Sequence, residues 1–294
     1  MTSEKALVSV IMNCFNGEQY LSQAVKSVLD QDYDNFEVIF WDNQSTDNSA
    51  SIFKSFNDKR LKYFYAKTHT NLYEARNHAI EKSNGEYIAF LDTDDIWECD
   101  KLSTQIPLFQ NKRVGFVYSN YLILDETKKN KYQSKNKLFR NEVSANLLKN
   151  YFIGLLTLII RRSAYENIKE KFDPNLQIIG DLDFTYRLSL NWYGDYSTKN
   201  LAICRKHGEN LLNKQSHRNI EELVYFEKKL KKHFDVKSLE GFYEFKQNKI
   251  YLSIKENLKQ KEYIEAFKNI YKIKSLKFKI KGIILFFLPK SLFK

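Results

Sequence analysis

The stretch LVSVIMNCFNGEQYLSQAVKSVLDQDYDNFEVIFW, residues 7–41, decides the fold class because its pattern predicts a strand, a helix and a second strand. Residues 7–12 and 36–41 are short apolar runs rich in β-branched or aromatic side chains, as is typical of buried strands. Between them, apolar side chains recur on one helical face: Tyr20, Leu21, Ala24, Val25, Val28 and Leu29. Strands joined in this way by a helix form right-handed crossover units, so we expect a parallel sheet.

The same alternation continues as far as residue 91. Residues 61–67 and 86–91 predict two further strands. The helix predicted between them, over residues 72–85, ends at Gly85 as a glycine C-cap. In such sheets ligands bind beyond the carboxyl ends of the strands, and three of these ends carry polar residues.

The middle of the chain is less regular. Residues 114–124 and 155–162 predict strands, and the Lys- and Asn-rich segment 125–137 between them predicts an exposed, mobile loop. Residues 178–192 predict a helix that begins with acidic residues, which suit a helix N-terminus. Residues 196–214 predict a strand followed by a loop that contains a histidine.

Length and composition allow one large domain with an appendage. The chain has 294 residues, of which 43% are hydrophobic, enough for a sizeable core. Because the pattern becomes Lys-rich and helical near Asn219, we divide the chain into residues 1–215 and a C-terminal helical region, 216–294. The cysteines are far apart without metal-site spacing, and the N-terminus has no secretory pattern, so we expect a cytoplasmic protein.

The basic charge is concentrated at the C-terminus. The formal net charge of +11 attracts nucleic acid, anionic lipid or phosphorylated small molecules. Residues 275–294 contain five lysines and no acidic residue, and their apolar run 283–288 is too short to span a bilayer. This pattern favours a peripheral contact with the inner face of the cell membrane through anionic lipid. The alternative is a solvated helix that packs on its own domain.

The acidic residues gather at the end of the fourth predicted strand. In FLDTDDIW, residues 90–97, three carboxylates follow a buried run within four positions: Asp92, Asp94 and Asp95. A divalent cation makes such a cluster favourable, because Mg²⁺ and Mn²⁺ take oxygen ligands and bridge to substrate phosphates. Alone, the cluster could also be a capping turn.

The order and spacing of several motifs resemble those of family 2 glycosyltransferases, which have the GT-A fold. The resemblance covers residues 7–110 clearly and is weaker as far as about residue 215. It is carried by VSVIMNCFNGEQYLSQAVKSVLDQDYDNFEVIFWDNQSTD, EARNHAIEKSNGEYIAFLDTDD, IIGDLDFTYRL and RKHGENL. It implies an α/β fold with a Rossmann-like, mostly parallel central sheet flanked by helices, followed by the C-terminal helical extension. Residues 1–110 would be the nucleotide-sugar half of the domain, and residues 111–215 the acceptor half.

The resemblance also implies roles in donor binding. Backbone at Cys14 and Phe15 would line a base pocket, and Asp42 would accept from the N3–H of a uracil or thymine base. Arg76 would face the base or diphosphate, and Asp92 would hold the ribose or a metal-bound water. From the residues alone, Asp42 could instead cap its own turn, and Arg76 could form a surface pair on its helix.

Metal and base roles follow from the same resemblance. Asp94, together with His207 of the late loop, would bind Mn²⁺ or Mg²⁺, and Asp95 has no certain role. Asp181 would be the general base. Asp183 is a weaker candidate because it lies roughly 200° around the helix from Asp181. Alternatively, both acids complement the helix dipole, and His207 packs on its own turn.

The chain departs from the family pattern at two of these motifs. Asp42-Asn43-Gln44-Ser45 stands where Asp-Asp-Gly-Ser is usual, which puts other contacts from that loop in doubt. Gly180 stands where the family has a Glu before the base. Neither change removes a group to which we assign chemistry.

We therefore expect an inverting, metal-dependent glycosyltransferase of bacterial surface-polysaccharide type. Its donor would be a nucleoside-diphosphate sugar, UDP-linked, and its acceptor a hydroxyl of a glycan or polyprenyl-linked oligosaccharide. A nucleotidyltransferase is the main alternative, but NCFNGEQ, residues 13–19, has one Gly and no basic residue to hold a triphosphate. The second alternative is a basic protein that binds nucleic acid or membranes and has no catalytic activity. Nucleic acid is not expected as a partner, because no nucleic-acid motif is present and the lysines lie away from the acidic strand ends.

Overall fold

The computed structural model describes residues 5–208 and 215–288. The described residues form two compact units. The first contains residues 5–143 and 152–208, and the second contains residues 144–151 and 215–288. The division predicted at residue 215 therefore differs in one respect, because a short helix from the middle of the chain belongs with the C-terminal helices.

The N-terminal half of the sheet is parallel, as predicted. β1 (Val8–Cys14) lies between β2 (Phe36–Asp42) and β4 (Tyr87–Phe90), and β3 (Leu61–Tyr65) extends the sheet beyond β2. All of these pairings are parallel, so the carboxyl ends of these strands share one edge of the sheet. This edge carries most of the predicted site.

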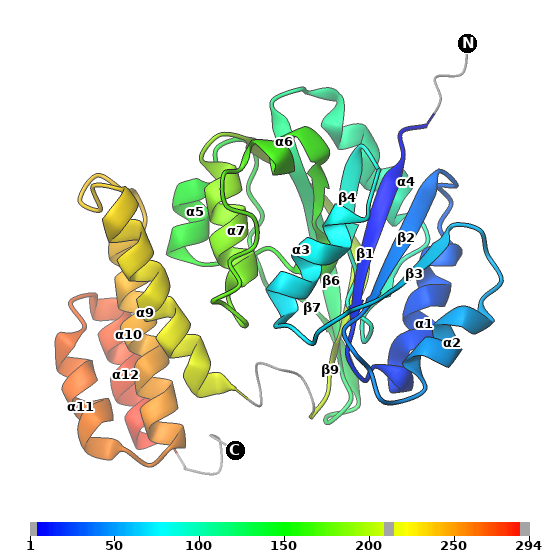
Figure 1. Ribbon diagram of the computed structural model, residues 1–294. Coiled ribbons are helices and arrows are strands. Elements are labelled where there is room, and N and C mark those ends of the chain that lie inside the picture. Colours follow the sequence, from blue (N-terminus) through cyan, green and yellow to red (C-terminus); the bar gives the residue numbers. More distant parts are fainter. Residues whose placement is uncertain (1–4, 209–214, 289–294) are drawn as a thin grey trace. The chain divides into compact units, whose positions relative to one another are not determined.

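Helices cover both faces of these strands (Figure 1). α1 (Glu18–Leu29) and α2 (Ser49–Ser55) pack on one face, and α3 (Leu72–Glu81) packs on the other. The side-chain alternation of a strand explains this arrangement. Met12 and Phe40, for example, point into the core shared with α1, where Val25 is fully buried. The expected α/β class is confirmed.

The second half of the sheet is mixed. Beyond β4 the order continues through β8 (Ile159–Arg161), β6 (Val114–Asp125), β9 (Tyr193–Lys206) and β5 (Ile96–Trp97). Only β6 and β9 are parallel, while β8 runs antiparallel to both of its neighbours. The parallel pairing that the sequence predicts thus holds for the N-terminal half and for β6 with β9.

Two local predictions in this half were wrong. Residues 155–162 do not form one strand, because Leu155–Thr157 is a 3₁₀ turn before β8. The segment 125–137 is not entirely loop, since β7 (Asn130–Gln133) pairs with β6 as a hairpin. The first unit also contains these helical elements: α4 (Lys101–Gln105), a 3₁₀ helix (Ile106–Gln110), α6 (Arg162–Asn167) and α7 (Gly180–Ser189).

The predicted glycine C-cap of α3 was also wrong. The helix ends at Glu81 with Lys82 as its C-cap, and Gly85 has no positive φ. Gly85 is needed for a different reason, because a Cβ there would lie 2.5 Å from the backbone nitrogen of Ser9. The glycine lets the chain that enters β4 pass close to the start of β1.

The second unit is helical. It consists of α5 (Ser144–Lys149), α9 (Ser216–His233), α10 (Phe242–Lys259), α11 (Tyr263–Lys272) and α12 (Leu276–Phe287). A separate apolar cluster joins α10, α11 and α12. No helix of the described residues is both long and apolar enough to cross a bilayer. Residues 289–294 of the predicted lipid-binding stretch lie outside the described residues.

Candidate active site

The first two strand ends of the site lie side by side. Cys14 and Asp42 are partners in the parallel register of β1 and β2. Cys14 is buried, and burial is the main cause that raises the pKa of its thiol, so the side chain packs rather than reacts. Phe15, the next residue, is 54% exposed, and its ring lies 4.5 Å from that of His69. Exposed rings at a strand end offer faces on which a planar base can stack.

His69 was not predicted from the sequence. It lies in the connection between β3 and α3, and its Nδ1 is 2.8 Å from the backbone oxygen of Asn43. The Asn43 side chain also bonds to backbone at Thr70. These contacts fasten the connection to the end of β2. The sequence around His69 does not indicate this position, because its contacts with Phe15 and Asn43 join parts of the chain that are distant in sequence.

Asp42 caps the turn that follows β2, which is the second of the two roles considered for it from the sequence. One carboxylate oxygen accepts from the Ser45 backbone N–H at 2.7 Å, and the other accepts from the Tyr63 hydroxyl at 2.6 Å. The side chain has no exposed surface. In this arrangement Asp42 shapes the loop beside the base-stacking rings, and direct contact with a base would require the turn to open.

Arg76 lies behind Asp92 instead of on the helix surface. Its Nη2 is 2.8 Å from Asp92 Oδ1, and the rings of Tyr73, Phe90 and Phe172 surround its guanidinium. The Arg76 side chain is 2% exposed and that of Asp92 is 41% exposed. Arg76 therefore orients Asp92 toward solvent, and the direct contact of Arg76 with a base or diphosphate stays a prediction.

Asp94 and His207 lie next to each other in the folded chain. His207 Nε2 lies 3.0 Å from Asp94 Oδ2, although more than a hundred residues separate them. Burial raises the pKa of Asp94, the charge of Asp92 raises it further, and the contact with His207 opposes both. Glu209, Asn210 and Leu211 of the same motif lie outside the described residues.

The donor set fits a hard divalent cation that keeps other ligands. Within residues 5–208 and 215–288, no group of three or more His, Cys, Asp or Glu side chains is arranged as a closed metal site. Asp94 and His207 offer an oxygen and a nitrogen, and the charge repulsion around Asp94 is what a bound cation would relieve. Substrate phosphate and water would complete such a site.

Asp95 and Arg205 form a support beneath this pair. Buried Asp95 accepts from the Arg205 backbone N–H at 2.9 Å, and the guanidinium of Arg205 donates to the backbone oxygen of Asp94 at 3.0 Å. The same guanidinium contacts Glu126 at 2.6 Å and Gln23 at 2.7 Å. Asp95, which had no certain role, is thus structural. Arg205 was missed, because an arginine two residues before His207 does not by itself indicate a support.

The predicted base stands at the start of α7. Asp181 is partly exposed, and its Oδ1 lies 3.4 Å from the hydroxyl of Tyr73 in α3. That hydroxyl also lies 3.2 Å from the backbone oxygen of Ile178. Tyr73 therefore links the helix that carries Arg76 to the helix that carries Asp181.

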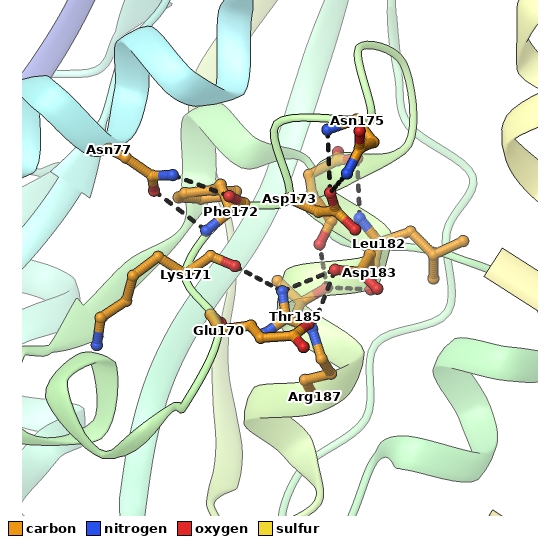
Figure 2. A network of polar contacts seen from close by, with 11 residues as sticks. Asn77, Glu170, Lys171, Phe172, Asp173, Asn175, Leu182, Asp183, Thr185 and Arg187 are labelled. Atoms are coloured by element: carbon orange, nitrogen blue, oxygen red, sulfur yellow. Dashed lines mark hydrogen bonds and ion pairs between the residues drawn. The ribbon is translucent and has the colours of Figure 1, made fainter. Parts of the chain in front are cut away.

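Asp183 is bound to Arg187 and has a structural role (Figure 2). It has no exposed surface, and one of its oxygens lies 3.0 Å from Nε and 2.7 Å from Nη2 of Arg187. Arg187 also donates to the backbone oxygens of Glu170 and Lys171. The geometry supports Asp181 over Asp183 as the base.

Contacts thus join three distant segments into one site. Asp92 contacts Arg76, the Arg76 guanidinium lies 5.3 Å from the centre of the Tyr73 ring, and Tyr73 contacts Asp181. The Asn77 side chain adds two hydrogen bonds to backbone of Phe172, which tie α3 to the loop before α7 (Figure 2). A partly exposed carboxylate thus stands near the acidic strand end, as transfer to a hydroxyl requires.

Comparison with known proteins agrees with this geometry. The description "Glycosyl transferase family 2" matches residues 9–169, about half of the chain. The match contains the strand ends of β1, β2 and β4 together with α3, and it ends before Asp181 and His207.

Individual proteins are similar over half of the chain or more. UDP-Glc:alpha-D-GlcNAc-diphosphoundecaprenol beta-1,3-glucosyltransferase WfgD of Escherichia coli is 37% identical over 53% of this chain and 61% of its own length. Putative teichuronic acid biosynthesis glycosyltransferase TuaG of Bacillus subtilis is 34% identical over 62% of this chain and 71% of its own length. The crystal structure of S. aureus TarS 1-349 superposes with a TM-score of 0.67 at 19% identity, covering 91% of this chain and 81% of that one. That structure supports the fold.

Proposed function

The chain belongs to glycosyl transferase family 2, and on that premise we propose that it transfers a sugar from a UDP-sugar to a hydroxyl of a lipid-linked glycan. The observation that carries this proposal is the chain of contacts from Asp92 through Arg76 and Tyr73 to Asp181. It brings a candidate base to the acidic strand end.

Donor binding is supported by the rings beside β1 and β2. Phe15 and His69 would stack on the base, while the turn capped by Asp42 holds the loop next to them. Asp92, oriented by Arg76, would accept from a ribose hydroxyl or from a water near the diphosphate. The choice of uracil is supported by the name of the E. coli relative, which is a UDP-glucose enzyme.

Asp94 and His207 would hold Mn²⁺ or Mg²⁺ beside the diphosphate. When bound, such an ion supplies positive charge that stabilises the departing nucleoside diphosphate. The chain itself contributes the support: Arg205 donates to the backbone oxygen of Asp94 and to the carboxylate of Asp95, and the Asp94 carboxylate faces His207.

Asp181 would act as the general base. As the acceptor oxygen bonds to the anomeric carbon, its proton passes to an Asp181 oxygen and the bond from that carbon to the diphosphate oxygen breaks. Because Asp183 is bound to Arg187, Asp181 is the acid at this helix start that can take this proton. One base and attack opposite the leaving group give inversion at the anomeric carbon.

Exposed apolar side chains of the second unit support a membrane-bound acceptor. On α11 and α12 they are Ile264, Phe267, Tyr271, Leu276, Ile280, Ile283, Ile284 and Phe287. Lysines accompany them, among them Lys272, Lys277 and Lys281. Apolar residues that would enter the lipid boundary, with cations beside them, suit an anionic membrane surface. We infer that α11 and α12 hold the enzyme at the inner face of the membrane, near its acceptor.

A donor screen tests the proposal. Nucleotide release from UDP-, GDP-, ADP- and thymidine diphosphate-sugars is measured with Mn²⁺ present, using lipid-linked saccharides from bacterial membranes as acceptor. We expect turnover with a UDP-sugar and a loss of at least about a hundredfold in kcat for Asp181→Asn, the usual contribution of a general base.

Asp94→Asn should raise the Mn²⁺ concentration needed for half-maximal turnover, while thermal unfolding checks that both variants fold. Turnover with ADP- or GDP-sugars alone overturns the uracil assignment. An Asp181→Asn variant that folds and keeps full turnover overturns the assigned base.

A further inference from the structure

A second pocket lies on the α3 face of the sheet, at its β3 edge, and we call it the side pocket. It has a volume of about 450 Å³, within the range of about 300–1,000 Å³ that is usual for small-molecule sites. The residues that line it are Trp41 of β2, Phe64 and Tyr65 of β3, Lys67 and Thr68 of the following connection, and His78 and Lys82 at α3.

The side pocket is separate from the proposed donor site. None of Phe15, Asp92, Asp94 and His207 lines it. Arg76, which serves the donor site, and His78 are two positions apart on α3, roughly 200° around the helix. Arg76 is buried toward Asp92, whereas 39% of the His78 side chain is exposed. The two sites therefore use different sides of the same helix.

Aromatic rings form the walls of the side pocket. The Trp41 and His78 rings are stacked, with centroids 5.4 Å apart, and Tyr65 is 58% exposed although it is large and apolar. The indole N–H of Trp41 is buried and has no acceptor among the described residues. An unsatisfied buried donor is costly, so an acceptor that entered beside this ring would be favoured.

The charge in the side pocket is positive. Lys67 and Lys82 are exposed and form no ion pair with any described residue, and no carboxylate lines the pocket. The nearby acid is Glu81. Its Oε2 lies 3.5 Å from His78 Nδ1, but Glu81 does not line the pocket. Two cations without acidic partners next to open rings favour an anionic ligand.

We propose that the side pocket binds a pyranose residue that carries a carboxylate or phosphate group, as part of a longer glycan. The apolar face of the sugar ring packs on Tyr65 and Trp41, and its anionic group lies between Lys67 and Lys82. A nucleobase would need paired donors and acceptors along its edge, and these walls are mostly aromatic. The site lies at the edge strand β3, so a chain can continue past it into solvent. The inference does not depend on the transfer reaction.

Binding of a uronate-containing oligosaccharide tests the proposal. Its affinity is measured by calorimetry on the whole protein and compared with that of the same oligosaccharide after its carboxyl groups are reduced to alcohols. A phosphorylated pyranose and free inorganic phosphate are measured in parallel. We expect the acidic form to bind about tenfold more tightly than the reduced form, as a charge-assisted hydrogen bond contributes. Free phosphate should bind much more weakly than the phosphorylated sugar.

Variants locate the binding. The double variant Lys67→Ser/Lys82→Ser should lose the preference for the acidic form, and Tyr65→Ala should weaken both forms. The matched control, Lys26→Ser/Lys112→Ser, removes two exposed lysines outside the pocket. Equal losses in the pocket and control variants overturn the proposal, as does competition by UDP. Asp94→Asn should bind the oligosaccharide normally even where nucleotide release is lost, so a failure of the proposed enzyme function is distinguishable.

Discussion

The ring of Tyr73 occupies the space that a side chain at Gly180 would need. A Cβ at position 180 would lie 2.4 Å from Tyr73 Cε2. Tyr73 is buried beside Arg76 and stacks on Phe172, so its ring has little freedom to move away. The departure from the Glu-Asp pattern thus has a structural reason, because the ring that contacts Asp181 takes the place of the neighbouring side chain.

Gly180→Ala should therefore displace Tyr73 and, with it, Asp181. We expect a loss of about 1–3 kcal/mol in the free energy of unfolding, as is usual for overpacking, and a lower kcat. Urea unfolding and donor turnover measure the two effects. Tyr73→Phe separates the two effects, since it keeps the ring in place and removes only the hydroxyl that contacts Asp181. A Gly180→Ala variant with normal stability and kcat would contradict this packing.

Arg205 is expected to be a positioning residue for Asp94. Arg205→Met should lower kcat by about 10–100-fold and raise the Mn²⁺ concentration needed for half-activation, because groups behind a metal ligand commonly have effects of this size. Arg205→Lys should recover only part of the lost kcat, since a single ammonium cannot make all the hydrogen bonds that the planar guanidinium makes. Arg113→Met, which removes a cation from the Tyr193 ring, is the control. A variant whose stability falls while its metal response stays normal would make Arg205 merely structural.

The Arg76–Asp92 pair predicts an asymmetry in stability. Asp92→Ala leaves the buried guanidinium of Arg76 without its partner, which should cost about 3–5 kcal/mol. Arg76→Met leaves Asp92 partly exposed to water, which can solvate it, so this variant should lose less stability while still losing activity. Urea unfolding of both variants compares the two costs. A larger loss of stability for Arg76→Met than for Asp92→Ala would show that a group other than Asp92 satisfies the buried charge of Arg76.

Glu37 predicts a dependence of stability on pH. It is buried in β2, which would raise its pKa, but Lys62, the Asn84 backbone N–H and Ser9 together outweigh burial and lower the pKa. The lowered pKa of the folded state stabilises the protein above the unfolded value of about 4.3, and this contribution is lost as pH falls through the folded value.

Glu37→Gln should therefore be less stable than the natural chain at neutral pH. The gap in unfolding free energy should narrow as the pH is lowered below about 4. Glu166→Gln, at an exposed position, should show no such trend. A gap that stays constant over this pH range would argue against a stabilising Glu37 carboxylate.

Apolar contact through α12 predicts lipid binding. Ile280→Ser/Ile284→Ser should weaken binding to phosphatidylglycerol vesicles about tenfold or more, given about 1.5–3 kcal/mol for burying each such side chain. Binding should fall with added salt and be weak on phosphatidylcholine. Co-sedimentation measures it, with the exposed Val224 of α9 changed to Ser as the control. Equal loss in the control would place the contact elsewhere.

Local pattern was enough for the parallel half of the sheet. Strand and helix periods between residues 7 and 91, together with the rule that crossover units are right-handed, predicted the sheet edge on which Cys14, Asp42 and Asp92 lie. The antiparallel strand β8 could not be predicted, because its place between β4 and β6 depends on pairing between distant segments.

The sequence by itself determined which residue types stand at the strand ends and at the start of α7, since motif order and spacing are local properties. Only the tertiary structure decided which of them remain accessible. Arg76, Asp95 and Asp183 belong to the same motifs as the accessible site groups, but all three are buried with partners from other segments or, for Asp183, the next helical turn. Burial is set by long-range packing, and for that reason only the folded chain showed that Asp92, Asp94 and Asp181 stay partly exposed while Asp95 and Asp183 are buried.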